Sequence, residues 1–158
     1  MYIILMIILI VEILEVTENK EQYIDLLLLA DEQESMIEKY LNRGNLFALY
    51  DDYDLKTAAV VTKENNDTYE IQNIATLKIY QGKGYGSGMM KHIIQYCKNK
   101  CKYLIVGTGE NEKILLFYEK FGFIYSHTVK DFFTNNYDHA IIEDGKQLKD
   151  KIYLKFSY

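Results

Sequence analysis

The sequence predicts an α/β fold: one domain in which a mixed, mostly antiparallel central sheet is flanked by helices. Apolar stretches of strand length and amphipathic stretches of helical spacing follow one another in the order β-α-α-β-β-β-α-β-α-β-β. The 158 residues suffice for a sizeable core, and 49% hydrophobic and 26% charged residues are typical of a globular chain. The chain has no proline and no glycine- or serine-rich linker, so we expect residues 1–158 to form a single domain.

The chain begins with an uninterrupted apolar run at residues 2–11. This run is far shorter than the roughly 20 residues that a membrane-spanning helix needs. No basic region precedes it, and no small-residue cleavage site follows it. We therefore interpret it as a buried strand, with a signal-like or membrane-associating segment as the alternative, and Met6 could be the true start.

The remaining elements follow from the spacing of apolar residues and from the turn residues between them. In the first half we expect a strand within residues 7–16, helices over 20–30 and 32–41, and strands over 46–50, 57–62 and 69–77. In the second half we expect helices over 88–100 and 111–121 and strands over 103–106, 123–127 and 152–156. The stretch 130–150 is irregular and too long for an ordinary connection.

The net charge of −5 at pH 7 argues against general binding to nucleic acid or to an anionic membrane. Cys97 and Cys101 lie four residues apart on a predicted helix and continue its apolar stripe, so we expect them in the core. Their spacing matches neither a redox pair nor a zinc hook, and a reducing cytoplasm is the expected compartment. No metal site is expected, because none of the histidines has a partner at ligand spacing: His92, His127 and His139.

The most informative motif is a glycine-rich run at residues 81–88, with the sequence QGKGYGSG. It holds four of the nine glycines, and it lies between a predicted strand and a predicted helix. In such a loop, backbone N–H groups can converge on an anion, and glycine allows positive φ and close approach of a phosphate. A tight strand–helix turn is the alternative interpretation.

Two common nucleotide-binding loops are excluded by the positions of these glycines. The dinucleotide pattern G-x-G-x-x-G fails in each frame, because its third glycine would fall on Ser87, Met89 or Lys91. The mononucleotide pattern G-x-x-x-x-G-K fails because Ser87 follows Gly82 by five residues. A phosphate-bearing ligand of another kind remains.

Two segments together resemble the GNAT N-acetyltransferase family, and residues 132–154 resemble the tail of a bacterial small-molecule-type subgroup of that family. Residues 81–86 resemble the family's acyl-CoA loop, Q/R-x-x-G-x-G/A. Residues 111–123, NEKILLFYEKFGF, resemble its second motif, N-x-x-A-x-x-x-Y-E-K-x-G-F. Ile114 stands where the family commonly has alanine, which we expect to crowd the cofactor side. The order of elements matches the family fold from about residue 9 to 156.

The resemblance implies acetyl-CoA as co-substrate and a set of residues that hold it. The loop amides at the start of the following helix would bind the pyrophosphate, which agrees with the unpaired N–H groups and the dipole of a helix N-terminus. The strand before the loop would bind the pantetheine arm, and one of its N–H groups would face the thioester oxygen as an oxyanion donor. The implied cofactor-binding residues are Ile74, Ala75, Thr76, Gln81, Gly82, Lys83, Gly84, Tyr85, Gly86, Ser87 and Asn111.

The family transfers acetyl to a primary amine within a ternary complex, and the resemblance implies two catalytic residues. At pH 7 only about one alkyl amine in a thousand is neutral, so a proton must leave before the amine attacks. Glu70 precedes the glycine loop by the same number of residues as a catalytic glutamate in one branch of the family, and it would act as the base through a water molecule. Apart from any bulge, Glu70 shares a strand face with Gln72 and Thr76. Tyr118 is the implied acid for the departing thiolate. The alternatives are an exposed strand glutamate and a core tyrosine.

Aromatic and acidic residues at 131–139 and 143–145 suit a cationic amine, whether a small molecule or a peptide amine. The acidic turn at 51–54 could add to this surface, and a packed acidic loop is the alternative. A non-catalytic, regulatory acetyl-CoA-binding module on the same fold is the competing function, although such a module would need neither Glu70 nor Tyr118. Edge strands near the C-terminus would allow a homodimer, by analogy with the family.

Overall fold

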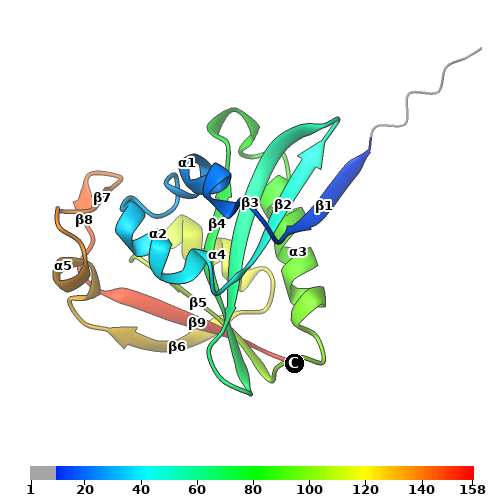
Figure 1. Ribbon diagram of the computed structural model, residues 1–158. Coiled ribbons are helices and arrows are strands. Elements are labelled where there is room, and N and C mark those ends of the chain that lie inside the picture. Colours follow the sequence, from blue (N-terminus) through cyan, green and yellow to red (C-terminus); the bar gives the residue numbers. More distant parts are fainter. Residues whose placement is uncertain (1–9) are drawn as a thin grey trace, which may run out of the picture.

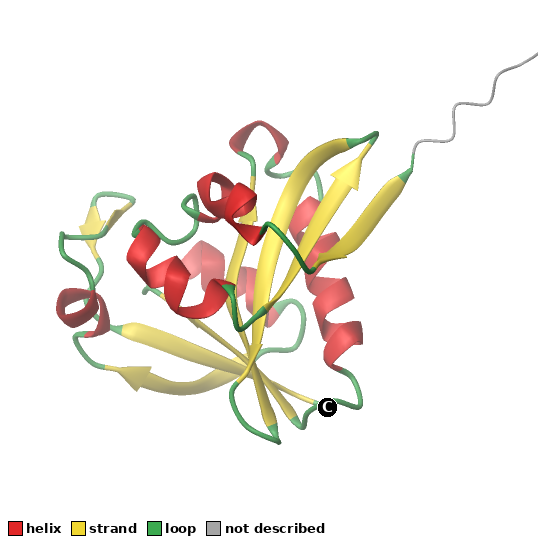
Figure 2. Ribbon diagram, viewed as in Figure 1, coloured by secondary structure: helices red, strands yellow, loops and turns green. Residues whose placement is uncertain are grey.

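The computed structural model describes residues 10–158, which form a seven-stranded sheet with helices on both faces (Figures 1 and 2). The strand expected over residues 2–11 lies almost entirely in residues 1–9, outside the described residues. Its two described residues, Ile10 and Val11, are 51% and 59% exposed.

The strands in chain order are β1 (Val11–Val16), β2 (Asn45–Asp51), β3 (Asp54–Lys63), β4 (Thr68–Thr76), β5 (Tyr103–Thr108), β6 (Ile124–Val129), β7 (Ile142–Glu143), β8 (Lys146–Gln147) and β9 (Lys151–Ser157). The α-helices are α1 (Ile24–Leu27), α2 (Glu34–Leu41), α3 (Tyr85–Cys97), α4 (Glu112–Glu119) and α5 (Phe132–Asn136). Two 3-10 helices, η1 (Lys20–Tyr23) and η2 (Lys78–Tyr80), precede α1 and the glycine loop.

The sheet has a gap between two of its central strands, β4 and β5. The order is β1-β2-β3-β4-β5-β9-β6, with β4 and β5 parallel and the other neighbours antiparallel. The parallel pairing runs only from Thr68 opposite Tyr103 to Ile71 opposite Val106. Beyond that point β4 continues to Thr76 and β5 to Thr108 without pairing to each other. The sheet therefore opens where these two strands diverge.

A β-bulge in β4 lies at the start of this divergence. Val60 of β3 pairs with Asn73, and Val61 pairs with Ile71, so Gln72 has no partner residue on β3. Because side chains alternate between the two faces of a strand, one extra residue reverses the face of everything that follows. Glu70 and Thr76 therefore lie on opposite faces, so the shared face expected for them in the absence of a bulge is not found, whereas Glu70 and Gln72 do share a face.

Two hydrophobic layers hold the helices on the sheet. One packs α3 and α4 against it and includes Met89, Ile93, Cys97 and Tyr118. The other packs α1 and α2 against the opposite face and includes Leu27 and Ile37. Cys97 is fully buried, which confirms its predicted core role, whereas Cys101 is only partly buried and lies beyond the end of α3; both cysteines are free.

Most predicted elements are present, with three differences. α3 begins at Tyr85 rather than at residue 88, because Gly84 at φ +90° ends the loop and glycines 86 and 88 lie inside the helix. The helix expected over 20–30 is the short pair η1 and α1, which ends at Leu27. The irregular stretch 130–150 contains α5 and the hairpin β7–β8, which lie together near α2 in Figure 1.

Candidate active site

The gap between β4 and β5 is part of a cleft with a volume of about 550 Å³. The glycine loop, the first turn of α3 and one side of α4 line one part of it. The segment between α1 and α2 and the connection from β6 to β9 line the other part. A ligand in this cleft could thus contact both faces of the sheet through the place where the strands separate.

The edge of β4 in the gap carries backbone groups without strand partners. The N–H of Leu77 donates to the carbonyl of Lys56 on β3 at 3.0 Å. Successive N–H groups of a strand point to opposite sides, so those of Thr76 and Ile74 point away from β3, toward the gap. The Gln81 side chain donates to the Thr76 carbonyl at 3.1 Å and so holds the loop against this edge. Ile74 and Thr76 line the cleft, whereas Ala75 points into the core under α1 and α2.

Open space borders two glycines of the loop. Gly82 and Gly84 adopt φ of +72° and +90°, and a Cβ on either would meet no atom within 4 Å. Glycine is thus required by the backbone conformation at these two positions, and the space beside them is open to a ligand. Tyr85 fixes the first turn of α3, because its hydroxyl donates to Asp51 Oδ2 at 2.6 Å. The predicted loop residues that line the cleft are Gln81, Gly82, Gly84, Tyr85, Gly86 and Ser87, whereas Lys83 does not line it.

Tyr118 of α4 lines the cleft and is otherwise enclosed, with 6% of its surface exposed. Burial raises the pKa of its hydroxyl above the ordinary value of 10.0, so the group keeps its proton near neutral pH. Phe117 and Phe123 contact the ring edge-to-face and fix its orientation. The geometry leaves a protonated oxygen available at the wall of the cleft.

Glu70 lies beside the cleft rather than in its lining. It is 7% exposed, and burial raises the pKa of its carboxyl, while the nearby Lys151 ammonium and Tyr153 hydroxyl act in the opposite direction. It faces Thr62 across the β3–β4 pair, on the face that also carries Gln72, whose amide donates to the Thr62 hydroxyl at 3.0 Å. Any proton transfer from the cleft to Glu70 must therefore pass through an intermediary group.

Asn111, which the resemblance implies as a cofactor-binding residue, is the N-cap of α4. Its Oδ1 accepts from the N–H of Lys113 at 3.1 Å, and its Nδ2 lies 3.3 Å from carboxylate oxygens of Glu143 and Asp144. Asn111 does not line the cleft, although Lys113 and Ile114 do. Its side chain ties α4 to the hairpin β7–β8.

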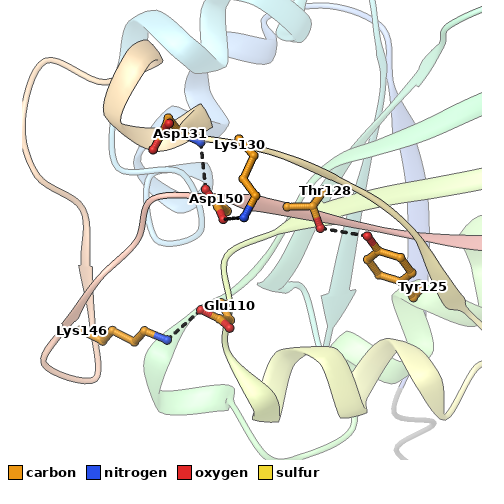
Figure 3. Close-up of polar contacts among 7 residues, drawn as sticks. All are labelled: Glu110, Tyr125, Thr128, Lys130, Asp131, Lys146 and Asp150. Atoms are coloured by element: carbon orange, nitrogen blue, oxygen red, sulfur yellow. Dashed lines mark hydrogen bonds and ion pairs between the residues drawn. The ribbon is translucent and has the colours of Figure 1, made fainter.

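We use the name β6–β9 flap for residues 130–150, which form one wall of the cleft. Figure 3 shows how the flap is anchored. At its two ends, Asp150 accepts from the Lys130 ammonium and from the N–H of Asp131, both at 2.9 Å. Within the flap, Lys146 of β8 pairs with Glu110 at 2.8 Å. On the preceding strand, the Tyr125 and Thr128 hydroxyls lie 3.1 Å apart.

The inner side of the flap is joined to the segment between α1 and α2. The Tyr137 hydroxyl donates to Asp31 Oδ1 at 2.7 Å, and the N–H of Asp138 donates to Gln33 at 2.9 Å. Phe133, Tyr137 and Glu143 line the cleft, as the aromatic and acidic composition suggested. The acidic turn at 51–54 does not line it.

Lys151 lines the same part of the cleft, and sequence reasoning missed it. Its ammonium lies 4.4 Å from the ring centroid of Phe132 and 5.1 Å from that of Tyr153. Burial lowers its pKa, and the charges of Glu70 and Asp31 act in the opposite direction. The available signal was indirect: Gly107 follows the strand predicted at 103–106, and the absence of a side chain there leaves room for Lys151.

Within residues 10–158, no group of histidine, cysteine, aspartate and glutamate side chains is arranged to hold a metal ion. In the same part of the chain, no helix is long and apolar enough to cross a membrane.

The model of the family described as Acetyltransferase (GNAT) family matches residues 11–123. The chain belongs to the GNAT acetyltransferase family. The uncharacterized N-acetyltransferase YvbK of Bacillus subtilis (strain 168) is 35% identical over 140 residues, which cover 87% of this chain and 90% of that protein. The predicted family, the α/β fold and the enzyme class, an acetyltransferase, are confirmed.

Solved structures of family members are similar over nearly their whole length. A GNAT family acetyltransferase from Elizabethkingia anophelis, solved with acetyl-CoA bound, has a TM-score of 0.88 and 33% identity, with 94% of this chain and 98% of that chain covered. A Bacillus subtilis acetyltransferase solved in complex with CoA has a TM-score of 0.87 and 31% identity, with 94% and 99% covered. A Bacillus cereus protein described as an IAA acetyltransferase has a TM-score of 0.87 and 32% identity, with the same coverage.

Proposed function

We propose that this acetyltransferase moves the acetyl group of acetyl-CoA directly to a primary amine while both substrates occupy the cleft. The observation that carries the proposal is the path of the cleft, which runs from the glycine loop through the gap between β4 and β5 to the β6–β9 flap. Donor and acceptor could meet in this gap. Relatives of about 31–33% identity solved with CoA or acetyl-CoA support the choice of donor.

The glycine loop and the start of α3 would hold the pyrophosphate of acetyl-CoA. The first N–H groups of a helix have no partner within it, and its dipole favours an anion at this end. The open space beside Gly82 and Gly84 fits such a ligand. The N–H groups of Ile74 and Thr76 are the donors that would stabilise charge on the thioester oxygen as the amine adds.

Two side chains would handle protons. The acceptor amine has to lose a proton before it attacks, and Glu70 is the proposed final acceptor of that proton, reached through an intermediary because it does not line the cleft. Tyr118 keeps its proton at neutral pH and lines the cleft, which suits the role of acid for the CoA thiolate. A thiol is a fair leaving group, so this protonation has a modest effect.

An acceptor panel tests the proposal. Purified protein is incubated with acetyl-CoA and aminoglycosides, polyamines, amino acids or peptides, with free thiol and acetylated amine both measured. We expect at least one amine to gain one acetyl group for each CoA released. Acetyl-CoA binding without turnover on any amine would instead favour a non-catalytic acetyl-CoA-binding module.

A further inference from the structure

Lys151 lines the part of the cleft beside the β6–β9 flap, which is the acceptor side under the proposed function, and its ammonium has no ion-pair partner among the described residues. In the described part of the chain its ammonium has neither an ion pair nor a hydrogen bond. A partly desolvated ammonium in this state is costly unless a ligand or solvent compensates it. The Lys151 side chain passes over Gly107 of the neighbouring strand β5, where only glycine leaves room for it. A Cβ at Gly107 would collide with Lys151 Cε and would lie 2.9 Å from the Tyr153 ring.

The carboxylates around Lys151 are held by other groups. Asp150, its chain neighbour, is bound by Lys130 and by the N–H of Asp131. Asp31 accepts from the Tyr137 hydroxyl at 2.7 Å and from the Tyr40 hydroxyl at 3.1 Å. Glu70 acts on Lys151 through its charge but forms no ion pair with it. None of these carboxylates forms an ion pair with Lys151, so its ammonium could bind an anion that enters the cleft.

The acceptor side also carries negative charge. Asp31, Glu32 and Glu143 line the cleft together with Lys151, and Leu29, Phe133 and Ile141 supply apolar surface. A ligand with one positive and one negative group would match this distribution. A diamine would match it less well, because one of its ammonium groups would meet Lys151.

We infer that the acceptor is an amino acid-like molecule, whose carboxylate is bound by Lys151 and whose amine is directed toward the gap between β4 and β5. The inference rests on the proposed function and names its substrate class. Lys151 is then a specificity-determining residue. The contact of its ammonium with the Phe132 ring orients the Lys151 side chain.

Matched substrates test this assignment. Rates are measured with amino acids, with the same amino acids as carboxamides, and with diamines, for wild type, Lys151→Met, Lys151→Arg and the exposed control Lys149→Met. We expect wild type and Lys149→Met to prefer carboxylate over carboxamide. Lys151→Met should lower the ratio of kcat/KM for the carboxylate to kcat/KM for the carboxamide by about 10- to 100-fold, a range typical of a lost hydrogen bond to a charged group. Lys151→Arg should restore part of the preference.

The outcomes separate the inference from the proposed function. Equal wild-type rates on carboxylate and carboxamide would overturn it, as would equal losses on both in Lys151→Met. Stabilisation of each variant by acetyl-CoA in thermal unfolding checks that the donor site is intact. If wild type acetylates carboxamides or diamines but no amino acid, the inference fails while the proposed function stands. If no amine is acetylated, the proposed function itself fails.

Discussion

Tyr118 shows how one side chain can belong both to the core and to the site. Its ring packs between Phe117 and Phe123, yet the residue also lines the cleft. The sequence motif predicted that Tyr118 belongs to the site, whereas the helical spacing alone was equally consistent with a core residue. The face of Glu70 could not be predicted, because the bulge at Gln72 leaves no local signature in the sequence.

We expect Tyr118→Phe to lower kcat by about 100-fold, the low end for lost acid catalysis, because a thiolate is already a fair leaving group. The acetyl-CoA dissociation constant, measured by calorimetry, should stay within about twofold of wild type, since the ring that packs in the core is kept. Unchanged turnover would exclude Tyr118 as the acid.

The pH dependence of the rate tests Glu70. Burial raises its pKa above the ordinary value of 4.5, so the carboxyl is protonated, and unable to accept a proton, over a wider acidic range. We expect kcat/KM to fall as the pH drops through this raised pKa. Glu70→Gln should lower the rate at neutral pH by about 10²- to 10⁴-fold and remove that acidic limb. An acidic limb that persists in Glu70→Gln would assign it to another group.

At the scale of elements, the strand–loop–helix unit from β4 to α3 is the part that sequence reasoning recovered best. Alternating glycines and the strand before them predicted the unit, because the positive φ of Gly82 and Gly84 favours glycine there. The start of α3 was misplaced by three residues, since glycines 86 and 88 are unusual within a helix. The hairpin β7–β8 was missed because each of its strands has only two residues.

The loop offers a matched pair of glycine substitutions. Gly84 and Gly145 have φ of +90° and +77°, and neither has an atom within 4 Å of an added Cβ. Alanine at either position should cost about 1–2 kcal/mol in backbone strain. We expect only Gly84→Ala to raise the KM for acetyl-CoA, by about tenfold, because its strain acts on the turn that we propose binds the pyrophosphate. Equal KM values in the two variants would show that the loop does not bind the donor.

At the scale of the whole molecule, the site depends on long-range topology. β9, from the end of the chain, lies between β5 and β6 and carries Lys151 next to Gly107. The order of elements along the sequence predicted the fold, but not this insertion, so the acceptor side was the least predictable part of the site. Cys97, at the end of α3, lies in the core, and no cysteine lines the cleft among the described residues.

We propose direct transfer rather than a covalent acetyl-enzyme, because the cleft could hold donor and acceptor together. Initial rates measured while acetyl-CoA and an acceptor from the panel are both varied test this most directly. We predict intersecting lines in double-reciprocal plots, because both substrates must occupy the cleft before acetyl moves. Parallel lines, together with CoA release in the absence of amine, would show a covalent intermediate and contradict direct attack.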